Sequence, residues 1–259
     1  MVRRPGFPGS RRPRSPSWAC TCDVRGPPET VPRTTAEPRD DAAVRLRAGA
    51  SALGVQLDDA QVATLCRFLH ELELWNARVN LVGERDRLAL VERHLVDSLA
   101  AVPLLSALEA APRIADVGSG AGLPGVPLAI ALRAPTTWLI EPRKKRASFL
   151  RSVRRALGDV GLEVVEARGE DVAARADCRG AFDVVVSRAT LADRDLLACA
   201  APLVRPGGLL VAYRGPNPGS PPDVGAVHAS SFDGPTVHRY DLKGAGRAFR
   251  LDVWTRCFT

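Results

Sequence analysis

Residues 114–130 combine residue types that are suited to binding a nucleotide-like cofactor. A short apolar run delivers Asp116, which is followed at alternate positions by Gly118, Gly120 and Gly122. Glycine is depleted in strands and accepts the positive φ of tight turns, so a strand is expected to end there. The apolar residues then return at helical intervals. Strand, glycine turn and helix bring backbone N–H groups close to a bound ligand.

Two kinds of cofactor fit this turn. Residues 120–125 match the pattern G-x-G-x-x-G, and Glu141 follows about 20 residues on, as a dinucleotide-binding fold requires. The rival pattern is an acidic residue before alternate glycines, which is usual for S-adenosylmethionine. In that interpretation Asp116 lies near the amino-acid end of the cofactor. Glu141, at the end of the next strand, then accepts hydrogen bonds from both ribose hydroxyls.

The elements around the turn favour S-adenosylmethionine. Strands are expected near 113–117, 136–141, 162–166, 182–187 and 208–213, and helices near 123–133, 143–157 and 191–203. This alternation predicts an α/β fold with a parallel, doubly wound, Rossmann-like sheet. Two further strands, near 235–242 and 248–257, predict an antiparallel C-terminal hairpin. Such a hairpin is typical of class I methyltransferases, and no substrate domain for a dehydrogenase is left over.

A helical cap is expected ahead of the glycine turn. Apolar residues recur at helical intervals over 41–54, 58–77 and 86–102. Asp58 and Gln61 stand at the spacing of a capping box. The predicted organisation is therefore a Pro/Arg-rich tail over 1–39, the helical cap over 40–110 and the methyltransferase domain over 111–259.

Composition and charge narrow the class of protein. The net charge is +7, but residues 1–39 alone hold eight arginines against three acidic residues, so the rest of the chain is only mildly basic. That tail also holds eight prolines without a hydrophobic period, so it is expected to be disordered; the alternative is a basic RNA-binding arm. Without a bilayer-length apolar run or a secretory signal, a cytoplasmic protein is expected. Cys20 and Cys22 lack a matching second pair, so neither a metal site nor a disulfide framework is predicted.

Several segments are specific in combination because of their order and spacing. They are 75–81 (Trp-Asn-Ala-Arg-Val-Asn-Leu), 93–98 (Arg-His-Leu-Val-Asp-Ser), 116–127, 141–150 and 187–189 (Ser-Arg-Ala). Through these segments, residues 66–215 resemble the RsmG family (also called GidB), the ribosomal RNA small subunit methyltransferases G. The resemblance implies rRNA methylation at N7 of a guanine in 16S ribosomal RNA, with S-adenosyl-L-methionine as the cofactor. It further implies ribosomal RNA or the small ribosomal subunit as partner, no membrane and a monomer.

The resemblance also implies a set of cofactor contacts, which extends from the glycine turn to the ends of the later strands. With the residues of the turn, the expected cofactor set is Asp116, Gly118, Gly120, Gly122, Leu123, Glu141, Gly169, Glu170 and Arg188. Arg188 follows the fourth strand, where cofactor and substrate should meet, and is the one candidate catalytic residue.

The substrate side is less determined. His94, Asp97 and Ser98 stand at i, i+3 and i+4, so one helix face can present all three. They either line the substrate cleft or tether the cap to the sheet, and both interpretations stay open. A hydrolytic Ser-His-Asp site is disfavoured, because residues so close on one helix cannot adopt the relay geometry. Asn80, Arg85 and Arg214 complete the candidate substrate set.

The absence of an evident acid/base pair agrees with the chemistry that the resemblance implies. N7 of guanine has a lone pair and no proton, so methyl transfer needs positioning rather than a general base. Departures from the family cluster on the substrate side, among them Arg214 where the family normally has lysine. The alternatives are therefore a divergent methyltransferase of another RNA or a small molecule, and a non-catalytic RNA-binding relative.

Overall fold

The computed structural model describes residues 38–188, 191–215, 231–242 and 248–258. The chain divides into two units, Met1–Ala36 and Glu37–Thr259, and every described residue belongs to the second. The tail predicted over 1–39 lies outside the described residues, except for its last two positions, which already belong to the first helix.

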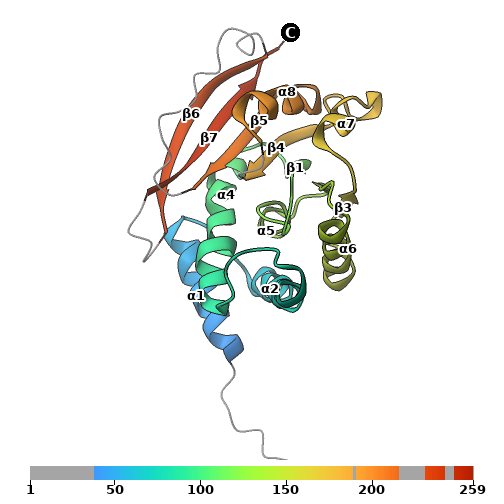
Figure 1. The fold of residues 1–259 in the computed structure, drawn as a ribbon. Coiled ribbons are helices and arrows are strands. Elements are labelled where there is room, and N and C mark those ends of the chain that lie inside the picture. Colours follow the sequence, from blue (N-terminus) through green and yellow to red (C-terminus); the bar gives the residue numbers. More distant parts are fainter. Residues whose placement is uncertain (1–37, 189–190, 216–230, 243–247, 259) are drawn as a thin grey trace, which may run out of the picture. The chain divides into compact units, whose positions relative to one another are not determined.

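A seven-stranded sheet runs through the second unit, in the order β3-β2-β1-β4-β5-β7-β6 (Figure 1). The strands are β1 (Ile114–Val117), β2 (Thr137–Ile140), β3 (Leu162–Val165), β4 (Phe182–Arg188), β5 (Val204–Arg214), β6 (Phe232–Asp241) and β7 (Ala248–Arg256). The first five pair in parallel, whereas β7 lies antiparallel between β5 and β6. The predicted doubly wound sheet with its antiparallel C-terminal hairpin is confirmed.

Alternating side chains of the central strands build one core on each face of the sheet. Ile114 and Val184 pack on one face, against the cap and against α5 and α6. Ala115 and Val185 point the other way and pack with α7 and α8. The helices are α1 (Pro38–Ala52), α2 (Asp59–Val79), α5 (Gly125–Ala131), α6 (Lys144–Leu157), α7 (Gly169–Ala173) and α8 (Asp193–Leu203). Because helices cover both faces, the parallel strands are apolar on both sides.

The first two cap helices form as expected. Helix α2 opens with the predicted capping box: the Gln61 N–H donates to the Asp58 carboxylate at 2.8 Å, and the Asp58 N–H donates to the Gln61 side chain at 3.0 Å.

Among the described residues, no helix has the length and hydropathy needed to cross a membrane.

The third expected helix, over 86–102, begins where it was predicted, with Asp86 as its N-cap, but it is not one regular α-helix. The chain instead forms α3 (Arg87–Leu90), a π-helical turn (Val91–Val96), a 3-10 turn (Leu99–Ala101) and α4 (Val102–Leu105). A π turn inserts an extra residue into the helical ladder, and such turns are common at functional sites. Pro103, which has no N–H to donate, falls in the first turn of α4. Helix α7 was not predicted, because five residues are too few to show a period.

Candidate functional site

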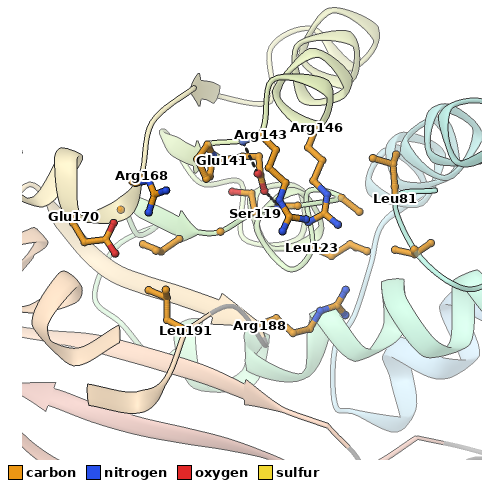
Figure 2. A pocket seen from close by; sticks show the side chains of 17 residues that line it. Leu81, Ser119, Leu123, Glu141, Arg143, Arg146, Arg168, Glu170, Arg188 and Leu191 are labelled. Carbon is orange, nitrogen blue, oxygen red and sulfur yellow. Dashed lines mark hydrogen bonds between the residues drawn. The ribbon is translucent and has the colours of Figure 1, made fainter. Parts of the chain in front are cut away.

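A pocket of about 800 Å³ opens at the carboxyl ends of β1, β2 and β4 (Figure 2). Strand β1 lies between β2 and β4, so the chain reverses its direction across the sheet here, and parallel α/β sheets bind ligands at such switch points. The lining residues are Leu81, Val82, Val117, Gly118, Ser119, Gly120, Ala121, Leu123, Glu141, Pro142, Arg143, Arg146, Arg168, Gly169, Glu170, Arg188 and Leu191.

Glu141 joins the glycine turn to the start of α6. Its carboxylate accepts the backbone N–H of Gly120 at 2.9 Å and that of Arg143 at 2.8 Å. Gly118 and Gly120 have φ values of +74° and +56°, a region that strains any side chain larger than hydrogen. The turn therefore presents bare backbone to the pocket. Glu141 holds it in place and keeps further carboxylate lone pairs for a ligand.

Asp116 lies beneath the turn rather than in the pocket. It is fully buried, and its Oδ2 accepts the N–H of Gly125 at 3.0 Å. A Cβ at Gly125 would stand 2.6 Å from that oxygen, so glycine is needed there for close approach. Burial raises the pKa of Asp116 to about 7. Gly122 is likewise not among the lining residues, and a Cβ built there would lie 2.9 Å from the Val126 side chain. One carboxylate oxygen of Asp116 is thus bound at the start of α5, and Asp116 is not among the residues that line the pocket; its contact with the cofactor stays a prediction.

Arg188 borders the pocket at the end of β4. Figure 2 shows it across the pocket from Arg143 and Arg146. Its Nη1 donates to Oδ2 of Asp97 at 3.0 Å, and the other oxygen of Asp97 accepts the Tyr240 hydroxyl at 2.6 Å. Asp97 is only 6% exposed, so these two donors compensate a buried charge. Tyr240 of β6 is thus connected to Arg188 through the carboxylate of Asp97, a residue of the cap.

His94 and Ser98, the other members of the predicted helix face, do not line the pocket. The Ser98 hydroxyl donates to the His94 carbonyl at 2.6 Å, and the Tyr213 hydroxyl donates to the Ser98 carbonyl at 2.7 Å. Burial, helped by the charge of Arg188, lowers the pKa of His94 to about 4, so its imidazole is neutral at pH 7. For Ser98 these contacts favour the tethering interpretation over a substrate contact.

The comparison with known proteins agrees with this geometry. A family model described as rRNA small subunit methyltransferase G (GidB) matches residues 61–220. The chain belongs to this family. The protein of that name from Burkholderia thailandensis is 41% identical over 180 residues, which cover 70% of this chain and 78% of the relative. The one from Syntrophus aciditrophicus is 36% identical over 169 residues, covering 65% and 69%.

Among solved structures, the ribosomal protein L11 methylase from Lactobacillus delbrueckii subsp. bulgaricus is 18% identical, with a TM-score of 0.48. That match covers 68% of this chain and 81% of that one.

In this member of the GidB family, the rest of the expected substrate set lies outside the pocket lining. Asn80 adopts a left-handed conformation at the end of α2, with φ +52°, and Arg85 is exposed on the following loop. Arg214 donates to Asp252 at 2.7 Å and also pairs with Asp193. Of the expected cofactor set, the pocket brings together Gly118, Gly120, Leu123, Glu141, Gly169, Glu170 and Arg188.

Sequence reasoning missed one wall of the pocket, which the loop after α2 contributes through Leu81 and Val82. Asn76 holds this loop: its amide nitrogen donates to the Glu84 carbonyl at 2.7 Å, and its amide oxygen accepts the Val82 N–H at 2.9 Å. Asn76 is 4% exposed, and its position beside Trp75 in the family segment was the available signal.

Sequence reasoning also missed three arginines of the lining, namely Arg143, Arg146 and Arg168. Two of them belong to the basic run that follows Glu141, which was a visible signal. Within the described part of the chain, no group of His, Cys, Asp and Glu side chains is arranged to hold a metal ion.

Proposed function

We propose that this protein is an S-adenosylmethionine-dependent methyltransferase that methylates N7 of a guanine in 16S ribosomal RNA, in the cytoplasm. The observation that carries the proposal is the pocket at the switch point, where the buried Glu141 adjoins an open glycine turn. Membership of the small-subunit rRNA methyltransferase G family supplies the acceptor.

The lining fits the cofactor in size and chemistry. A volume of about 800 Å³ lies in the range of small-molecule sites. Glu141 would accept the ribose hydroxyls, the backbone at Gly118 and Gly120 would face the amino-acid portion, and Gly169 with Glu170 would border the adenine. When bound, S-adenosylmethionine supplies a methyl group that its sulfonium makes electrophilic.

The chain's own contribution to the reaction would be positioning. Guanine N7 needs no deprotonation, so no side chain has to act as a base. Arg188, held by Asp97 at 3.0 Å, would orient the reacting groups at the pocket edge. The neutral His94 adds no second positive charge beside it.

Titration with S-adenosylmethionine, followed by calorimetry, tests the enzyme against the non-catalytic alternative. We expect saturable binding at one site per chain. No heat change at millimolar cofactor would exclude the methyltransferase.

The acceptor is tested by mapping N7-methylguanosine in 16S ribosomal RNA from cells with and without the gene. We expect one position to lose its methyl group. An unchanged map, together with cofactor binding by the purified protein, would point to another RNA or to a small molecule as the acceptor.

Arg188→Ala is the first variant to make. We expect weaker cofactor binding, slower methyl transfer or both. The fold should be retained at reduced stability, because Arg188 lies outside both cores but is one of the two donors to the buried Asp97. Wild-type activity in a folded Arg188→Ala protein would remove it from the site.

A further inference from the structure

A group of cationic side chains borders the pocket at the start of α6 and after β3. We call it the α6 rim, and it consists of Arg143, Lys144, Lys145, Arg146 and Arg168. Three of them line the pocket, and the two lysines are exposed beside them. Within the described residues, none of the five side chains forms an ion pair with a carboxylate, although the backbone N–H of Arg143 donates to Glu141.

The remainder of α6 is different. Farther along the helix, Arg151 pairs with Glu166 at 2.8 Å and Arg154 pairs with Glu163 at 3.1 Å. Two of the three arginines farther along α6 are therefore paired, one with an acid of β3 and one with the acid that follows β3, whereas none of the rim side chains is paired with a described carboxylate. The contrast lies within one helix, so an overall excess of arginine in the chain does not explain it.

The placement of the rim is electrostatically unfavourable for the protein alone. Four of its members stand at the N-terminal end of a 14-residue helix, where the helix dipole is positive, and the first turn contains no acidic residue. The proposed cofactor does not offset this repulsion, because S-adenosylmethionine itself carries a net positive charge. An anionic partner at the pocket mouth would offset it.

We infer that the α6 rim is the surface that binds the phosphates on either side of the target nucleotide. This inference rests on the proposed function and adds where the RNA is bound. Guanidinium groups match phosphate bidentately, and lysines add point charges. Because the rim borders the pocket, phosphates bound to it would hold the target base at the opening.

The double variant Lys144→Ala/Lys145→Ala tests the inference, because neither lysine lines the pocket. The matched control is Arg154→Ala/Arg155→Ala, which removes the same charge from exposed positions of the same helix. The probe is purified small ribosomal subunits that lack the modification. Affinity is measured over a range of salt concentrations, together with the KM for subunits and the Kd for S-adenosylmethionine.

We expect the lysine variant to raise the KM for subunits about tenfold and to lower the slope of log affinity against log salt by about two, one for each phosphate contact. Its Kd for S-adenosylmethionine should stay at the wild-type value. The control should keep the wild-type slope. Equal slopes in both variants, or an unchanged slope in the lysine variant, would overturn the inference. If the wild type itself does not methylate the subunits, the proposed function fails instead.

Discussion

Asp97 connects two residues that are far apart in the chain, Arg188 at the pocket and Tyr240 on β6. A carboxylate with two donors at 3.0 and 2.6 Å has little freedom to turn, and it is buried. The position of the pocket arginine therefore depends on a phenol that does not itself line the pocket. The chain has a matched comparison in Tyr213, whose hydroxyl donates at 2.7 Å to the backbone carbonyl of Ser98.

Tyr240→Phe should reduce kcat/KM for methylation about tenfold, because a hydrogen bond to a carboxylate is lost while the ring that stacks on Phe249 stays. Tyr213→Phe should lower the melting temperature without changing kcat/KM. Combining Tyr240→Phe with Asp97→Asn tests whether Tyr240 acts on Arg188 through Asp97, since coupled residues give non-additive effects. Additive effects, or equal losses in both tyrosine variants, would count against a positioning role for Tyr240.

The pKa of His94 makes a prediction about acid stability. Its pKa is about 4 in the folded protein, against 6.5 for an unperturbed histidine. The unfolded chain therefore binds a proton that the folded chain rejects, and stability is lost as pH falls from 6.5 toward 4. His94→Gln should flatten this part of the stability curve, by at most about 3 kcal/mol. Urea unfolding between pH 4 and 7 measures it; parallel curves for the two proteins would contradict the assignment.

At the scale of elements, the loop between α2 and α3 is a wall of the pocket, and one buried amide holds it. Asn76→Ala would leave the Val82 N–H and the Glu84 carbonyl without their partner. We expect a loss of about 2–4 kcal/mol in unfolding free energy and weaker binding of S-adenosylmethionine, because Leu81 and Val82 line the pocket.

Gln61→Ala is the control for this prediction. The Gln61 amide also holds backbone carbonyls, those of Ile130 at 3.2 Å and Ala131 at 2.9 Å, but Gln61 does not line the cofactor pocket. It should lower stability and leave the cofactor Kd unchanged. If both variants weaken binding equally, the effect of Asn76 is on overall stability rather than on the pocket wall.

At the scale of the whole molecule, the charge is unevenly placed, with the excess of arginine in residues 1–39 and the unpaired rim beside the pocket. Binding to small ribosomal subunits should weaken steeply as salt rises, through release of counterions. Binding of S-adenosylmethionine should change little over the same range. An acceptor affinity that does not depend on salt would favour a neutral small molecule as the substrate.

Much of this molecule follows from local patterns. Short windows of the sequence show the apolar runs of β1 and β4, the helical period of α2 and α6, and the glycines after Asp116. Glu141 could be placed at the pocket for the same reason, since it directly follows a strand that neighbours β1. The fold and the position of the pocket beside the glycine turn were therefore predictable.

The rest depends on contacts between distant segments, which no local period encodes. Asp97 meets Arg188 and Tyr240 only once the hairpin has added to the sheet. Asp116 fits the sequence pattern of a ligand contact, yet tertiary packing buries it against Gly125, because a buried carboxylate must find a donor nearby. Short windows of the sequence are enough to recognise the sheet, the turn and the family. Which charged side chains line the pocket and which lie behind it depends on contacts between residues far apart in the chain, so it is visible only in the folded protein.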